Sequence, residues 1–150
     1  MRVYYKEEFD KIKTKVLKYI MYKKRTENEV RTKFQNDIDK DLLEDVIEYL
    51  KDADYIDDKN YIEKTVNNFQ ILKNLSTTEL KYKLLEKGLN RDLIEDYFYE
   101  NKEELIEYEI NSAMKIIKKK KDLEKQEIKN YLLKKGYKIE NINKAFEFGK

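Results

Sequence analysis

The fold is decided by the stretch Thr26-Glu27-Asn28-Glu29-Val30, because its pattern returns as Ser76-Thr77-Thr78-Glu79-Leu80 and again as Glu124-Lys125-Gln126-Glu127-Ile128. The first two stretches are capping boxes, in which a Thr or Ser hydroxyl accepts from the amide three residues later and the Glu reaches back to the cap. A capping box marks the start of a helix. The recurrence therefore predicts tandem copies of one helical unit.

The residues after each helix start have the spacing of an amphipathic helix, with apolar pairs four residues apart on one face. These pairs are Val30 and Phe34, Leu80 and Leu84, and Ile128 and Leu132. The second and third of these helices run into Lys87-Gly88-Leu89 and Lys135-Gly136-Tyr137. Because glycine favours the left-handed turn that closes many helices, we expect both helices to end there.

Apolar periodicity on both sides of each middle helix predicts two further helices in every copy. The sequence thus predicts an all-α fold of three tandem three-helix repeats, nine helices in total, over residues 1–54, 55–101 and 102–150. Because repeats of this kind stack on their neighbours, we expect an elongated, curved molecule.

The composition excludes most catalytic chemistry. The chain has no Cys and no His, and therefore lacks the commonest nucleophile and general base pairs. Its three glycines are isolated, which excludes a glycine-rich phosphate loop. The apolar runs are too short to cross a bilayer. We expect a cytoplasmic protein that is not an enzyme, with no catalytic residue, cofactor or metal.

One acidic stretch has the spacing of a calcium-binding loop, with Asp37, Asp39, Asp41 and Glu48 at the ligand positions. The position that needs Gly is occupied by Leu42, which belongs to the apolar stripe of a predicted helix. We therefore interpret Asp39 as the N-cap of that helix rather than as a metal ligand.

Another set of residues carries a family resemblance. Tyr55-Ile56-Asp57-Asp58 followed by Tyr61-Ile62 resembles the junction between the first two three-helix units of RecX regulators. The two Lys-Gly turns, each followed by an Ile-containing helix, are similar to those of the same family. The resemblance spans residues 16–146. The chain departs from the family at Asp54 and Leu75, where many members have Gly, and in using Lys almost throughout where the family has Arg.

The resemblance implies a regulator that lies in the groove of the RecA filament on DNA, and we expect this chain to be a monomer. Such a protein restrains filament growth, the ATPase and the recombination, repair and SOS activities that depend on them. The implied partners are the RecA filament and DNA, with weak binding to DNA alone. Two alternatives stay open, a direct DNA-binding protein built from tandem three-helix units and a helical scaffold that binds another protein.

The repeat alignment places cations at matching positions of the middle helices. Arg31, Lys81 and Lys129 correspond to one another, and Lys33 corresponds to Lys83. We predict that these five residues, the basic stripe, bind the filament or DNA phosphates. A secondary basic edge is predicted where the first helices of the first and third copies end, at Lys23, Lys24, Arg25, Lys118, Lys119, Lys120 and Lys121. The alternative for both sets is that the charges only keep the helices soluble.

Overall fold

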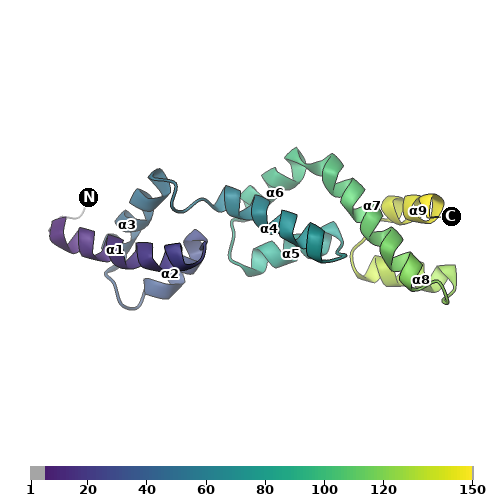
Figure 1. The fold of residues 1–150 in the computed structure, drawn as a ribbon, viewed down its shortest axis with the longest axis horizontal. Helices are drawn as coiled ribbons and strands as arrows, with labels where there is room; N and C mark the ends of the chain where they lie inside the picture. Colours follow the sequence, from purple (N-terminus) through teal and green to yellow (C-terminus); the bar gives the residue numbers. More distant parts are fainter. Residues whose placement is uncertain (1–5, 150) are drawn as a thin grey trace. The chain divides into compact units, whose positions relative to one another are not determined.

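The computed structural model describes residues 6–149, and all regular structure in this part of the chain is helical (Figure 1). The helices are α1 (Lys6–Tyr22), α2 (Glu27–Phe34), α3 (Lys40–Asp52), α4 (Asp58–Leu72), α5 (Thr77–Glu86), α6 (Arg91–Glu100), α7 (Lys102–Lys119), α8 (Lys125–Lys134) and α9 (Ile139–Phe148). The prediction of an all-α fold with three successive helix triplets is confirmed for the described residues. The predicted repeat boundaries stay predictions.

The described helices divide into two compact units. Unit 1 runs to Tyr61 and includes Lys87–Asn90, whereas unit 2 consists of Ile62–Glu86 and the chain from Arg91 onwards. In unit 1, α1, α2 and α3 pack on one another around a shared apolar core. The core residues of these helices are Val16, Ile20, Val30, Phe34, Leu42, Leu43, Val46, Ile47 and Leu50.

The middle helices α2 and α5 begin with the predicted capping boxes. Thr26 Oγ1 accepts from the Glu29 amide and Glu29 Oε1 accepts from the Thr26 amide, both at 3.0 Å. Ser76 and Glu79 make the same reciprocal pair, again at 3.0 Å. Since Thr26 and Ser76 are fully buried, the caps supply partners to amides that water does not reach. The third middle helix begins after Glu124, whose side chain makes no capping bond.

Left-handed residues close the helices as predicted. Gly88 has a φ of +79° and Gly136 a φ of +95°. The amide of Tyr137 donates to the carbonyl of Leu132 at 3.1 Å, and the Tyr137 side chain is buried in the core of unit 2. Asp54 adopts the same conformation after α3, with a φ of +63°. A non-glycine residue therefore stands where the backbone favours glycine.

In unit 2, α7 packs along α9, and α8 closes the same core. Beside this core lies Glu109 of α7, a carboxylate with no solvent exposure. It accepts from the amide of Thr77 at 2.8 Å, from the amide of Lys138 at 3.2 Å and from the side chain of Asn141. Thr77 and Lys138 stand at the starts of α5 and α9, where helix dipoles favour a negative charge. Glu109 thus joins three helices.

The acidic stretch near residue 40 is the start of a helix. Asp39 is the N-cap of α3, and its Oδ2 accepts from the amide of Leu42 at 3.2 Å. Both Asp41 and Glu48 lie within α3. This hydrogen bond confirms the interpretation of Asp39 as a cap. A calcium-binding loop at these residues would require α3 to unwind.

Candidate functional site

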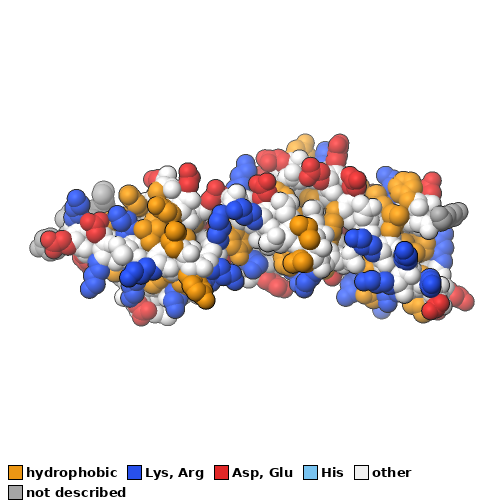
Figure 2. Space-filling model, viewed as in Figure 1, with side chains coloured by type: hydrophobic (Ala, Val, Ile, Leu, Met, Phe, Trp, Pro, Cys, Tyr) orange, Lys and Arg blue, Asp and Glu red, His pale blue; other side chains and the backbone are white. Residues whose placement is uncertain are grey.

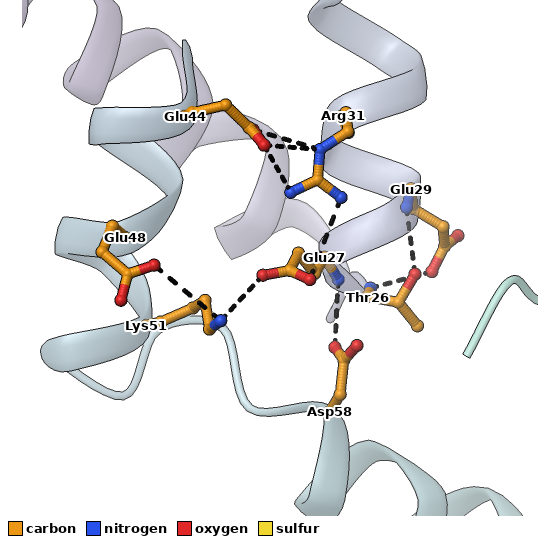
Figure 3. A network of polar contacts seen from close by, with 8 residues as sticks. All are labelled: Thr26, Glu27, Glu29, Arg31, Glu44, Glu48, Lys51 and Asp58. Carbon is orange, nitrogen blue, oxygen red and sulfur yellow. Dashed lines mark hydrogen bonds and ion pairs between the residues drawn. The ribbon is translucent and has the colours of Figure 1, made fainter. Parts of the chain in front are cut away.

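The first residue of the predicted basic stripe, Arg31, belongs to α2, and its side chain points toward Glu44 of α3 (Figure 3). Its Nε donates to both carboxylate oxygens of Glu44 at 3.1 Å, and its Nη2 lies 2.9 Å from Glu44 Oε1. A second carboxylate, Glu27, lies 3.8 Å from Nη1. The hydrogen bond with Glu44 is the main cause of a raised Arg31 pKa. The guanidinium therefore already has a forked carboxylate partner within the protein.

The ion pairs of Arg31 continue through Glu27 to the start of α4. Lys51 Nζ lies 3.0 Å from Glu27 Oε1, and this hydrogen bond raises the pKa of Lys51. The Glu27 amide donates to Asp58 Oδ1 at 3.0 Å, so Asp58 accepts from the first residue of α2. Burial raises the pKa of Asp58. Figure 3 shows that these charges form one connected network across α2, α3 and the start of α4.

Lys81, the counterpart of Arg31 in unit 2, has the corresponding acidic partner. Its Nζ donates to Glu95 Oε1 on α6 at 2.9 Å, and this hydrogen bond lowers the pKa of Glu95. Sequence reasoning missed both acids, although the interval from Arg31 to Glu44 differs by one residue from that between Lys81 and Glu95. A cation on the middle helix that pairs with a Glu on the third helix is thus a recurring feature of two repeats.

The third member of the stripe, Lys129, lacks this pairing. The interval that leads from Lys81 to Glu95 leads from Lys129 to the exposed Asn143. No acidic side chain among the described residues lies within ion-pair distance of Lys129. Of the three corresponding cations, Lys129 is the one without an ion pair to a described acidic side chain.

Lys33 and Lys83 lie over aromatic rings of the preceding helix. Lys33 Nζ is 5.8 Å from the ring centroid of Tyr19, and Lys83 Nζ is 5.6 Å from that of Phe69. In the third copy the aromatic residue is on the middle helix instead, where Tyr131 has Lys120 Nζ at 4.2 Å. Cations over ring faces are attracted by the ring quadrupole. All three repeats therefore pair a cation with an aromatic ring. In the first two repeats the middle helix supplies the cation, whereas in the third it supplies the ring.

The residues of the secondary basic edge differ in their contacts within the protein. Arg25 lies over the Tyr19 ring at 4.2 Å and pairs with Glu29 at 3.8 Å, so it is a structural contact of unit 1. Lys24 Nζ donates to Asn60 Oδ1 at 3.2 Å, and Lys23 is exposed. In unit 2, the cations at the end of α7 are mostly exposed, and Lys118 lines two hollows of the surface.

Unit 2 also contains a groove that sequence reasoning did not identify. It has a volume of about 600 Å³ and is formed by residues of α5, α6, α7 and α9. Cations line it from four separate segments, namely Lys81, Arg91, Lys102 and Lys138. Exposed rings of Tyr82 and Tyr99 lie beside them, and Lys102 Nζ is 4.8 Å from the Tyr99 centroid. No sequence interval connects these residues, because the groove depends on how the helices pack.

Charged and apolar side chains are interspersed over the face of the protein that Figure 2 presents. None of the described helices is long and apolar enough to cross a membrane.

The chain is 34% identical over 137 residues to the regulatory protein RecX of Staphylococcus carnosus, covering 87% of this chain and 51% of that protein. It is 36% identical over 132 residues to the regulatory protein RecX of Staphylococcus epidermidis, covering 84% and 49%. The chain belongs to the RecX family. It spans about half the length of these RecX relatives. No family model matches it.

Solved RecX structures have the same fold. The crystal structure of RecX from Lactobacillus salivarius superimposes with a TM-score of 0.80 at 26% identity, covering 95% of this chain and 97% of that one. A second crystal structure of a regulatory protein RecX gives a TM-score of 0.76 at 19% identity, covering 93% and 73%. The resemblance seen at the Tyr55–Ile62 junction and the Lys-Gly turns is therefore confirmed as family membership.

Proposed function

We propose that this chain regulates a RecA-type recombinase by binding its filament on DNA and restraining filament growth. The observation that carries the proposal is membership of the RecX family, whose relatives above are named regulatory proteins. In this proposal the chain makes and breaks no covalent bond. It acts by differential binding to the assembled filament, so it shifts the equilibrium between filament and free recombinase.

The basic stripe supplies the contacts in this proposal. Lys129 carries a charge that no described acid neutralises, and Lys33 and Lys83 hold their charges over rings. Arg31 and Lys81 already have the partners Glu44 and Glu95, and binding must exchange those ion pairs for new ones. The exchange costs little for the single contact of Lys81 and more for the forked contact of Arg31.

The decisive experiment is a titration of the single-stranded-DNA-dependent ATPase of the cognate recombinase. The chain is added far below one molecule per recombinase subunit, with filaments verified by electron microscopy. Inhibition at these ratios supports regulation through the filament, because each regulator molecule then affects many subunits. No effect at equimolar protein, with filaments present, contradicts the proposal.

The groove in unit 2 favours a second candidate function, direct binding of single-stranded DNA. Arg91, Lys102 and Lys138 offer contacts to phosphates, Lys81 does so on leaving Glu95, and the exposed rings of Tyr82 and Tyr99 offer faces on which bases stack. Salt distinguishes the two candidates, because affinity for bare DNA falls steeply with the logarithm of salt concentration. Tight, salt-sensitive binding to an oligonucleotide without recombinase, combined with an unchanged ATPase, supports this candidate over the regulator.

A further inference from the structure

Two apolar hollows lie on either side of the exposed lysines at the end of α7. The larger hollow has a volume of about 840 Å³ and is lined by Met114, Ile117, Ile128 and Phe146, with the exposed Phe148 at its edge. The smaller hollow, of about 480 Å³, is lined by Ile71 and Leu72. Lys115 and Lys118 line both. All of these residues belong to unit 2.

Several large apolar side chains around the hollows are exposed to solvent. Ile71 is 80% exposed, Leu72 is 76% exposed and Phe148 is 60% exposed. Neighbouring exposed apolar groups with a polar rim mark interaction sites more often than chance positions do. The hollows therefore have the composition of a surface that a partner covers.

The lysines between the hollows are not neutralised within the protein. Lys115, Lys118 and Lys121 are exposed, and no acidic side chain among the described residues lies within ion-pair distance of any of them. Lys125 adds a fourth cation to the larger hollow, with its Nζ 5.1 Å from the Phe146 ring centroid. This contrasts with Arg31 and Lys81, whose charges have carboxylate partners in the chain. An acidic partner would complete the pairing here.

We propose that this surface binds an acidic amphipathic helix of a protein partner. Apolar side chains of that helix enter the two hollows, and its Glu or Asp residues pair with Lys115, Lys118 and Lys121. This mode uses the standard physics of a helix in a groove, in which residues one turn apart serve as anchors. The surface includes Lys118 and Lys121 of the secondary basic edge but no residue of the basic stripe of the proposed function, and recombinase binding through that stripe can fail without affecting it.

Charge alone does not distinguish this partner from DNA or an anionic membrane, but the apolar groups do. Bases stack on aromatic rings, whereas Ile71 and Leu72 are aliphatic and would stay exposed beneath a phosphate backbone. A membrane surface accepts apolar groups that project from a helix, whereas Met114, Ile117 and Ile128 line a hollow that must be filled from outside. An acidic helix with apolar anchors would cover the exposed aliphatic side chains and also fill the hollow.

Fluorescence anisotropy with a defined peptide tests the proposal on the full chain. The probe is a fluorescein-labelled peptide with Leu on one helical face and Glu on the other, compared with a scrambled peptide of identical composition. We expect saturable binding of the first peptide and at least about tenfold weaker binding of the second, because only the amphipathic order presents anchors on one face. Equal binding of both peptides overturns the proposal. So does binding of an oligonucleotide or of phosphatidylglycerol vesicles in preference to the amphipathic peptide.

Variants locate the binding surface. The triple change Lys115→Glu, Lys118→Glu and Lys121→Glu is expected to weaken peptide binding at least about tenfold. The matched control is Lys11→Glu, Lys15→Glu and Lys18→Glu, which reverses as many charges on α1 of unit 1. Phe148→Ser, at an exposed site, tests the apolar contribution without reversing charge. Unchanged affinity in both test variants, with circular dichroism reporting an intact fold, overturns the proposal.

Discussion

Glu109 on α7 accepts a hydrogen bond from the backbone amide of Thr77, the first residue of α5, at 2.8 Å. The other carboxylate oxygen accepts from the amide of Lys138, which precedes α9. Because the carboxylate has no solvent exposure, the amides that it serves have few alternative partners. One buried acid therefore links α7 to the starts of α5 and α9 in unit 2.

Replacing Glu109 by Ala is expected to lower the free energy of unfolding by about 3 kcal/mol or more. The change removes the acceptor of the Thr77 and Lys138 amides and of the buried Asn141 side chain, and an unsatisfied buried donor costs about 1 to 3 kcal/mol. Urea denaturation followed by circular dichroism measures the loss. The control is Glu107→Ala, an exposed residue of the same helix. An equal effect of both substitutions would mean that the buried hydrogen bonds contribute nothing specific.

The repeated unit and most of its helix limits could be predicted from the sequence, because capping boxes and Lys-Gly turns are local signals. The capping bonds between Ser76 and Glu79 span three residues, and the left-handed φ of Gly136 closes the turn that directly follows α8. Glu109 could not be predicted in this way. Its role depends on residues about thirty positions away on either side, and a Glu in a highly charged helix normally faces solvent.

The candidate site was predictable only in part. The repeat alignment directly gives the corresponding cations Arg31, Lys81 and Lys129. It does not show which of them form ion pairs within the protein. Two of them pair with acids on the third helix of their repeat, and the third lacks such a pair. The groove with Tyr82 and Tyr99 arises from tertiary packing, which no local pattern encodes.

Asp54 offers a test of the helix-end geometry. Its φ of +63° favours glycine, the residue that many RecX sequences have at this junction, so Asp54→Gly is expected to raise the free energy of unfolding by about 0.5 to 1 kcal/mol. The matched control is Asp52→Gly at the last residue of α3, where glycine is expected to destabilise by up to about 0.5 kcal/mol, because Asp is already a weak helix former. Thermal denaturation of both variants gives the comparison. Destabilisation by Asp54→Gly would contradict the left-handed assignment.

Lys129 is expected to contribute more to partner binding than its two counterparts. In the proposed function, Lys129→Ala removes a charge that no described acid neutralises, whereas Arg31→Ala and Lys81→Ala remove charges already paired with Glu44 and Glu95. We expect Lys129→Ala to weaken inhibition of the recombinase ATPase about tenfold, because charge contacts to a phosphate-rich partner are strong at low salt. Lys134→Ala on the same helix is the control. An effect of Lys134→Ala as large as that of Lys129→Ala would show that only total charge matters.

The triple change Arg31→Glu, Lys81→Glu and Lys129→Glu tests the whole basic stripe. It is expected to abolish filament binding while the helical circular dichroism signal persists, because charge reversal repels the phosphates and acids that the stripe is proposed to contact. Co-sedimentation with recombinase filaments measures the binding. Persistent binding by a folded triple variant would exclude the basic stripe as the contact surface.

Alkaline pH is expected to destabilise unit 2 through Tyr137, whose hydroxyl lies 2.7 Å from Ser112 Oγ. Burial raises the pKa of Tyr137, so above the ordinary tyrosine value of about 10 the unfolded chain loses this proton while the folded chain keeps it. The contribution is fully present below pH of about 10 and falls above it by up to about 1.4 kcal/mol per pH unit. Urea denaturation across this range gives the slope. Tyr137→Phe should reduce the slope, because no buried phenol then remains at this position, whereas the exposed Tyr22→Phe change should not. If the unfolding free energy falls equally steeply with pH in both variants, groups other than Tyr137 cause the alkaline loss of stability.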